Sequence, residues 1–403
     1  MKGGRRALSH LGGETDTWGD PAAARFLGEA FSSATDDGAR AHVHAFHSYP
    51  AKLHPDIARA LAEGLCSPGG VVLDPFMGSG TVLVESRLAG HQALGTDLNP
   101  IAVQLTALKA EGRSAAARTR LVAAAQRVAD LATERRKAKV GASRRYPPVD
   151  VELFAPHVLL ALDALKVGIV AEPDAATRRD LWLVLSSILT KLGRRRGDSS
   201  EGMDQKQIAR SFPARLFAMR ATELASQLTE LERLMPAGAP LPSAVLGDAR
   251  ELRHVAGGSV DLVLTSPPYP GNYDYLAHHR DRLRWLELDG AELDRGELGA
   301  RRHLEAAPAR AREAWSSQLT AALRAIDRVL KPDGLAALVL ADSAVGRAAL
   351  YEDDLVAAAA DLVGLRVIAR ASQPRPHFHG PTMEAFARRP RREHVIMLGK
   401  KRR

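Results

Sequence analysis

Short apolar segments that end on turn residues alternate with amphipathic helices near the start of the chain. Val71–Asp74 and Gln92–Asp97 are apolar and each ends on an aspartate, and Thr81–Leu88 has helical spacing between them. A strand, a tight turn, a helix and a second strand form the opening unit of a doubly wound α/β sheet. The pattern therefore predicts buried parallel strands here.

The same alternation returns in the last third of the chain. Amphipathic helices are predicted over Asp56–Gly64 and Gln318–Leu330. Five further strands are predicted over Ser243–Leu246, Val260–Leu264, Gly334–Ala341, Leu365–Ala371 and His394–Leu398. Together with the first two, these strands predict an α/β fold with a mostly parallel, seven-stranded sheet.

A segment of different composition separates the two α/β parts. From about residue 103 to 239, Ala, Leu, Arg and Glu dominate, and apolar residues recur every three or four positions. Because the strands on both sides belong to one sheet, we expect a helical insertion into a single domain. The expected organisation is a mostly flexible arm over 1–41, a first α/β part over 42–105, the insertion over 106–242 and a second α/β part over 243–403.

The charge balance favours a polyanionic partner. The formal net charge is +9, and basic residues cluster at Lys191–Arg196, Arg388–Arg392 and Lys400–Arg403. No segment approaches the roughly 20 apolar residues of a membrane span. The basic start, Met1–His10, precedes no apolar core, so it is not a secretory signal. These features predict a cytoplasmic protein.

The turn after the first strand has the features of a ligand-binding loop. It reads DPFMGSGT over Asp74–Thr81, and Gly78 and Gly80 allow a sharp turn and close approach to a ligand. A phosphate loop would need a third glycine or a Lys-Ser/Thr pair, and Asp74 would repel a phosphate. The acid instead suits a cationic amino group, such as that of the methionine part of S-adenosylmethionine.

Two more acids end successive strands. Asp97 is placed to accept hydrogen bonds from both ribose hydroxyls, with Leu98 against the adenine ring. Asp248 follows the third strand and is placed for the adenine amino group. Any one of these acids could be only a helix cap or turn residue, but three at successive strand ends after a Gly-rich loop is a rarer pattern.

A proline-stiffened loop, Ser266-Pro267-Pro268-Tyr269, follows another strand. Two prolines lock φ at about −65° and remove two donors, which gives a stiff loop with outward carbonyls. An exocyclic base amine is a poor nucleophile and needs its N–H groups held. Ser266 Oγ and the Pro267 carbonyl can accept these hydrogen bonds, and Tyr269 can stack on a base flipped out of the duplex.

These motifs resemble those of the DNA amino-methyltransferases, the N4-cytosine and N6-adenine family. Asp74–Gly80 is similar to the family's cofactor motif, Thr265–Tyr269 to its catalytic motif and His47–Pro55 to its upstream motif, which covers the methionine end of the cofactor. The resemblance implies a Rossmann-like class I methyltransferase fold, S-adenosylmethionine as cofactor and DNA as substrate. The serine of the catalytic motif is more typical of N4-cytosine enzymes, and Asp or Asn of N6-adenine enzymes.

The motif order resembles the arrangement in which target recognition lies between the two central motifs. The predicted catalytic residues are Ser266, Pro267, Pro268 and Tyr269. The predicted cofactor-binding residues are Tyr49, Lys52, Asp74, Pro75, Phe76, Gly78, Ser79, Gly80, Thr81, Asp97, Leu98, Asp248 and Ala249. The predicted nucleic-acid contacts in the insertion are Arg194, Arg195, Arg196, Lys206 and Arg210.

Other functions remain open at this stage. An RNA enzyme acting on a guanine amino group in tRNA would usually carry Asp-Pro-Pro-Tyr and a separate N-terminal RNA-binding domain. A non-catalytic nucleic-acid-binding protein would not need the intact motifs. The single cysteine, Cys66, lies outside any Pro-Cys motif, which excludes methylation at carbon 5 of cytosine and a disulfide framework. A cognate restriction endonuclease is a conceivable partner, and the sequence reveals neither it nor the oligomeric state.

Histidines cluster just before the first strand. The spacing of His42, His44, His47 and His54 raises a metal hypothesis, but no cysteine and few acids lie nearby. Packing and hydrogen-bonding roles are the favoured interpretation, and no metal is predicted. His377 and His379 have no motif context.

Overall fold

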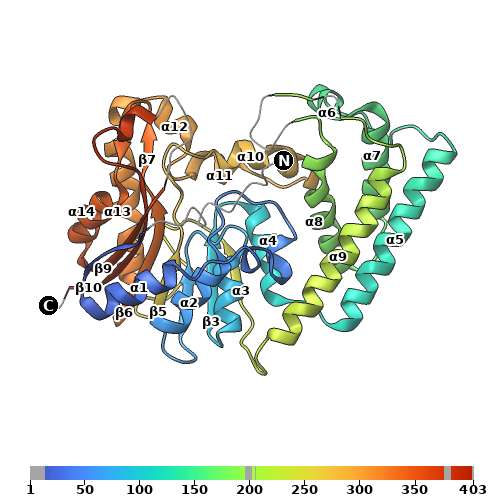
Figure 1. Ribbon diagram of the computed structural model, residues 1–403. Coiled ribbons are helices and arrows are strands. Elements are labelled where there is room, and N and C mark those ends of the chain that lie inside the picture. The colour runs from blue at the N-terminus through green and yellow to red at the C-terminus, as the bar shows by residue number, and fades with distance from the viewer. Residues whose placement is uncertain (1–13, 196–201, 205, 376–382, 402–403) are drawn as a thin grey trace.

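The computed structural model describes residues 14–195, 202–204, 206–375 and 383–401. Within these ranges the strands form an eight-stranded sheet of order β1-β9-β10-β6-β5-β2-β3-β4 and a separate ribbon of β7 and β8 (Figure 1). The strands are β1 (Asp16–Gly19), β2 (Val71–Asp74), β3 (Gln92–Asp97), β4 (Ser243–Leu246), β5 (Val260–Thr265), β6 (Leu330–Ala341), β7 (Ser343–Val345), β8 (Ala348–Leu350), β9 (Leu365–Pro374) and β10 (Arg392–Lys400).

The sheet is parallel from β4 to β6 and antiparallel from β10 to β1. All seven predicted strands are present, so the predicted Rossmann-like α/β fold is confirmed. The central strands β2 and β5 are buried on both faces, which explains why they are continuous apolar runs. Parallel pairing brings the ends of β2, β3 and β5 to one edge of the sheet.

The eighth strand and the helix after it correct the prediction of a mostly flexible arm for the described residues 14–41. β1 pairs with β9, and Asp20 caps the following helix α1 by accepting hydrogen bonds from Ala22 and Ala23. Leu27 and Phe31 of α1 are buried against the sheet. Four residues with an exposed pattern give no apolar signal, which is why the strand was missed. Residues 1–13 lie outside the described ranges.

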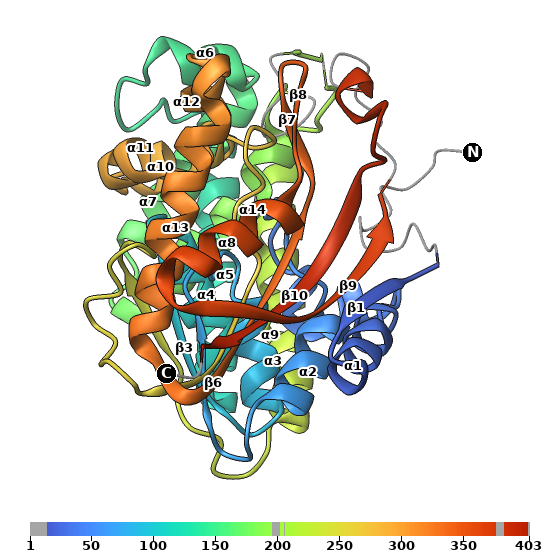
Figure 2. The ribbon, with the colours of Figure 1, turned by 90° about the vertical axis from the view of Figure 1, so that its left-hand side faces the viewer.

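Helices cover both faces of the sheet (Figure 2). α1, α2 and α3 pack on one face, and α13 and α14 pack on the other. None of the helices in the described part of the chain is long and apolar enough to span a membrane. The helices outside the insertion are α1 (Pro21–Phe31), α2 (Pro55–Leu65), α3 (Thr81–Leu88), α4 (Pro100–Glu111), α10 (Tyr275–Leu286), α11 (Ala291–Gly296), α12 (Arg301–Glu305), α13 (Ala311–Val329) and α14 (Glu352–Val363).

The predicted helical insertion forms a cluster beside the sheet (Figure 1). Its helices are α5 (Ala115–Lys137), α6 (Pro148–Leu153), α7 (Pro156–Val170), α8 (Ala175–Leu192) and α9 (Phe212–Leu234). The predicted boundary at 105/106 falls inside α4, which packs beside β3 and β4, so the inserted helices begin with α5. Their apolar side chains share one hydrophobic core with α3 and α4, so the insertion is packed into the domain.

Candidate active site

A pocket opens at the carboxyl ends of β2, β3 and β5, where parallel α/β sheets place their ligands. It encloses about 800 Å³, its open mouth included. The predicted residues that line it are Tyr49, Lys52, Asp74, Pro75, Phe76, Gly78, Ser79, Thr81, Asp97, Leu98, Ala249, Ser266 and Pro268. The structure thus brings both predicted motifs to one cavity.

The Gly-rich loop needs glycine at two positions. Gly78 and Gly80 have φ of +46° and +80°, a left-handed conformation that other residues rarely adopt. A side chain on Gly80 would lie 2.7 Å from Thr106 Oγ1, and one on Gly78 would lie 3.1 Å from the Tyr49 ring. The loop is therefore a cradle whose shape a Cβ atom would destroy. Gly80 does not line the pocket itself, but its left-handed conformation sets the course of the loop that does.

Two carboxyl groups face the pocket from adjacent strand ends, the buried Asp74 and the half-buried Asp97. Asp74 Oδ1 accepts hydrogen bonds from Phe76 N (3.0 Å) and Thr265 Oγ1 (2.5 Å), so it joins the cofactor loop to the strand before Ser266. Asp97 accepts from Gly78 N (2.9 Å) and Asn99 N (2.8 Å). Burial raises the pKa of Asp74 to about 7 and that of Asp97 to about 6.

Two lysines hold the backbone around the pocket, the buried Lys109 and the more exposed Lys52. Lys109 of α4 donates to the Ser79 carbonyl (2.7 Å), and burial lowers its pKa. Lys52 lines the pocket and donates to the His44 carbonyl (2.8 Å), and burial lowers its pKa to about 8. An ammonium group in the pocket, opposite the acids, suits a ligand that carries both a carboxylate and an amino group.

The catalytic loop reaches the pocket with Ser266 and Pro268 but not with Pro267 or Tyr269. The Tyr269 ring is buried, and its hydroxyl donates to Glu393 Oε1 (3.1 Å). Arg375 pairs with Glu393, and its guanidinium carbon lies 5.8 Å from the ring centroid. In this arrangement the predicted stacking face of Tyr269 is not presented to the pocket.

Asp248 departs from its predicted place at the adenine end of the pocket. Its carboxylate forms an ion pair with Arg250, with Arg250 Nε 2.9 Å from Oδ1. It lines an adjoining surface depression that shares Leu98 and Gly247 with the pocket, and the neighbouring Ala249 lines the pocket. An arginine two residues along the turn is close enough to draw the carboxylate away from the pocket, which the strand-end pattern does not reveal.

The predicted nucleic-acid contacts differ in their exposure and in their hydrogen-bond partners. Lys206 donates to the carbonyls of Thr190 (3.3 Å), Gly193 and Arg195 (3.1 Å), so its ammonium ties a loop together. The ammonium is therefore already paired with the backbone, and a phosphate contact of Lys206 stays a prediction.

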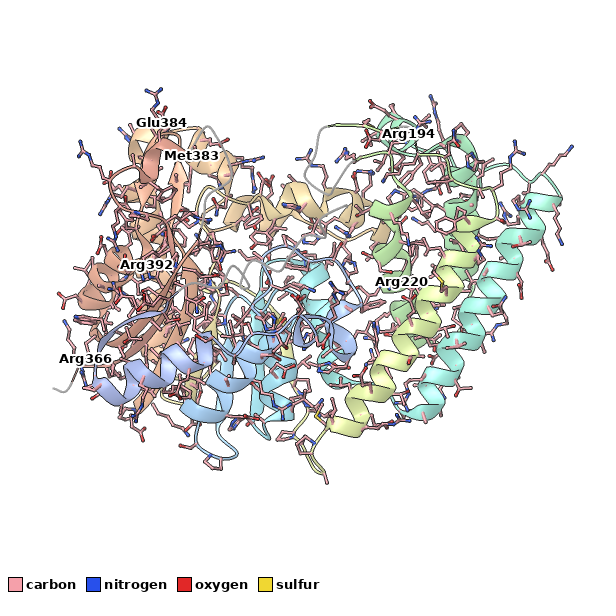
Figure 3. All side chains as sticks on the ribbon, in the orientation of Figure 1. Arg194, Arg220, Arg366, Met383, Glu384 and Arg392 are labelled. Atoms are coloured by element: carbon pink, nitrogen blue, oxygen red, sulfur yellow. The ribbon has the colours of Figure 1, made fainter. Side chains whose placement is uncertain are left out.

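The neighbouring arginines are more exposed. Arg194 lies near α6 and donates to the Glu152 carbonyl (Figure 3). Arg195 pairs with Asp281 (3.1 Å). Arg210 is exposed and has no polar partner among the described residues, and Arg196 lies outside them. A phosphate-contacting role for the arginines stays a prediction.

The four histidines before β2 do not converge on one point. His47 bonds to Ser186 and His54 to the Thr35 carbonyl, as expected for hydrogen-bonding roles. His42 and His44 lie 3.7 and 2.6 Å from Glu85 Oε1, a geometry that could hold a cation. Burial, and to a smaller extent the nearby Lys109, lower the pKa of both histidines, so their imidazoles are neutral. His377 and His379 lie outside the described residues.

Several residues that line the pocket were not predicted. Glu297 accepts from Tyr275 N (2.6 Å) and Arg302 Nη1 (2.6 Å), and burial raises its pKa. The other pocket residues without a prediction are Pro50, Ala51, Leu53, Met77, Val82, Asn99, Gly247, Tyr275, Leu293 and Leu298. Tyr275 is the first residue of α10, and Glu297 directly follows α11, so both lie at helix ends, where apolar periodicity does not mark them.

Comparison with known proteins finds similarity over part of the chain. Residues 15–108 match the family described as DNA methylase. Over 71 residues the chain is 34% identical to the type II methyltransferase M.MjaII of Methanocaldococcus jannaschii, which is 18% of this chain and 13% of that protein. Over 69 residues it is 38% identical to the type II methyltransferase M.MvaI of Kocuria varians, which is 16% of this chain and 15% of that protein.

The chain thus matches only a small part of the length of either relative. Among solved structures, the rRNA methyltransferase aviRa from Streptomyces viridochromogenes aligns with 91% of this chain and 94% of its own, at 14% identity and a TM-score of 0.35. So distant a likeness carries no information on the substrate.

Proposed function

We propose that this protein methylates an exocyclic amine in DNA, and specifically the N4 amine of cytosine. Residues 15–108 match the DNA methylase family, and two type II methyltransferases are similar over part of the chain. The cofactor is S-adenosylmethionine. The observation that carries the proposal is one pocket that holds the Gly-rich cradle, the carboxyls of Asp74 and Asp97, and Ser266 together. The choice of cytosine is supported by the serine of the catalytic loop.

The pocket residues fit this cofactor in charge and shape. Asp74 offers a carboxylate for the amino group, Lys52 an ammonium for the carboxylate, and Asp97 acceptors for the ribose hydroxyls. Leu98, Leu293 and neighbouring apolar side chains offer walls for the adenine ring. When bound, the cofactor supplies an electrophilic methyl group.

The catalytic loop orients the acceptor amine in this proposal. Ser266 lines the pocket, and its Oγ accepts an N–H of the amine, so that the nitrogen lone pair points at the methyl group. The Pro267 carbonyl, predicted as a second acceptor, belongs to a residue that does not line the pocket. The amine becomes acidic as it gains the methyl group, so no strong base is needed and orientation supplies the catalysis. The Thr265–Asp74 hydrogen bond fixes this loop relative to the cofactor loop.

Nucleoside mass spectrometry after incubation with labelled cofactor tests the proposal. We expect N4-methylcytosine in DNA. Detection of N6-methyladenine would support methylation of DNA but would overturn cytosine as the target base. Transfer to tRNA and not to DNA would overturn the proposed function.

Asp97→Asn should weaken the binding of S-adenosylhomocysteine about 10- to 100-fold, since it removes charged acceptors for the ribose. Isothermal titration calorimetry measures this affinity. Asp248→Asn is the matched control, because Asp248 is bound to Arg250 outside the pocket and its loss should leave the affinity unchanged. An equal loss in both variants would contradict the assignment of Asp97.

The affinity for S-adenosylhomocysteine should depend on pH with a maximum. Below the pKa of Asp74 (about 7) its carboxyl is neutral and attracts no amino group, and below the pKa of Asp97 (about 6) that carboxyl is neutral and accepts weaker hydrogen bonds from the ribose. Above the pKa of Lys52 (about 8) the ammonium is lost. Affinity should therefore rise between about 6 and 7 and fall above about 8. Asp74→Asn should move the rising limb down toward the pKa of Asp97, and a flat profile in the unaltered protein would refute the pairing.

A further inference from the structure

The loop before the cofactor pocket is anchored to the inserted helices. His47 Nε2 lies 2.9 Å from Ser186 Oγ of α8, and both side chains are buried. Arg220 of α9 donates to the Phe46 carbonyl, and its guanidinium carbon lies 5.7 Å from the Phe46 ring centroid (Figure 3). Two inserted helices therefore hold consecutive residues of this loop.

Arg282 of α10 adds a third anchor. Its Nη2 donates to Ser48 Oγ and to Thr190 Oγ1 of α8, each at 2.9 Å. The side chain is only 2% exposed. A buried guanidinium is costly unless its donors are satisfied, so this position is strongly specified by its partners. Arg282 thereby joins the insertion to the loop.

The anchored segment leads directly into the wall of the pocket. Tyr49 lines the pocket, and its hydroxyl accepts a hydrogen bond from Asn99 Nδ2 (3.3 Å). Its ring packs so closely on Gly78 that a Cβ atom there would lie 3.1 Å from it. Ala51 has φ of +50°, a conformation that persists in a non-glycine residue only when its surroundings enforce it. A shift of His47 and Ser48 would therefore move this wall.

We propose that Arg282, with Ser186 and Thr190 of α8, positions the loop against the bound cofactor. The insertion is then part of the cofactor site, in addition to any contact that it makes with DNA. Arg282 acts through Ser48 and the following Tyr49, so it is a positioning residue. The inference rests on the proposed function, because it takes S-adenosylmethionine as the ligand of the pocket.

A second buried contact of α8 supplies a matched control. Asp180 pairs with Arg113 (2.8 Å), which lies between α4 and α5, and neither residue contacts the loop or lines the pocket. Breaking this pair should destabilise the packing of α8 without moving Tyr49. A purely structural role of α8 predicts the same result for both sites.

The test measures the affinity of the full chain for S-adenosylhomocysteine by calorimetry, together with thermal unfolding. Ser186→Ala/Thr190→Val should weaken binding about tenfold. Asp180→Asn should lower the melting temperature and leave the affinity unchanged. Thr190→Ser, which keeps the hydroxyl, should bind more tightly than Thr190→Val. This single-residue pair also serves if the double variant does not fold.

The outcomes separate this inference from the proposed function. Unchanged affinity in both Ser186→Ala/Thr190→Val and Thr190→Val, or an equal loss in Asp180→Asn, would overturn the inference alone. An unaltered protein with no affinity for S-adenosylhomocysteine would overturn the proposed function and this inference with it.

Discussion

Replacing Ser266 by alanine should lower the rate of methyl transfer about 100- to 1,000-fold and leave cofactor affinity unchanged. The pocket brings Ser266 and Pro268 together with the Gly-rich cradle. In the proposed mechanism the serine hydroxyl accepts an amine N–H, so its loss removes an oriented polar contact at the reacting atom. Single-turnover transfer from labelled cofactor measures the chemical step, and calorimetry measures cofactor binding.

Ser259→Ala is the matched control for this experiment. Ser259 precedes β5 at the opposite end of the same strand, where its hydroxyl donates to the Ala256 carbonyl (2.8 Å). Its loss should leave the rate unchanged. If Ser266→Ala keeps the rate within a few-fold of the unaltered protein, the serine does not orient the amine. A loss of cofactor binding would instead place Ser266 in the cofactor site alone.

Gly80→Ala should lower the free energy of unfolding by roughly 3 kcal/mol and weaken cofactor binding. Gly80 has φ of +80° and caps α3, so alanine there takes on left-handed strain. Its Cβ would also lie 2.7 Å from Thr106 Oγ1 and 3.0 Å from Thr106 Cα, which forces the loop or α4 to move. Chemical denaturation measures the stability, and calorimetry measures the affinity.

Gly90→Ala separates backbone strain from the steric clash. Gly90 has φ of +82°, but nothing lies within 4 Å of its expected Cβ position. It should cost only about 1 kcal/mol and leave cofactor binding intact. Equal losses in the two variants would show that packing of Thr106 against the loop contributes nothing.

Local patterns were sufficient for most of the sheet. Val71–Asp74 and Val260–Thr265 are central strands buried on both faces, so their apolar runs stand out from the turns that bound them. β1 is short and exposed along its length, and only its pairing with β9 makes it a strand. The predicted end of the first α/β part falls inside α4, because the composition changes within this helix and not at its end.

The residues of the candidate site also fall into those that local sequence patterns predict and those that they do not. Gly78, Gly80 and Ser266 are marked by local chemistry, because a tight turn or a stiff loop needs particular residues at fixed spacing. Lys206 was assigned by charge alone, and the structure gives its ammonium three backbone carbonyls as partners. Charge in a sequence does not show whether a side chain is already paired.

The sequence by itself determined the α/β class, the cofactor cradle and the stiff loop, because each depends on the conformational preferences of neighbouring residues. Only the tertiary structure decided which side chains share the pocket. The side chains of Asp248 and Tyr269 bind Arg250 and Glu393 and do not line the pocket, whereas Glu297, which was not predicted, does line it. The two partners lie at very different distances along the chain, two residues for Asp248 and 124 residues for Tyr269. Such contacts set the direction in which a carboxylate or a ring points, and the spacing of residues in the sequence does not encode them.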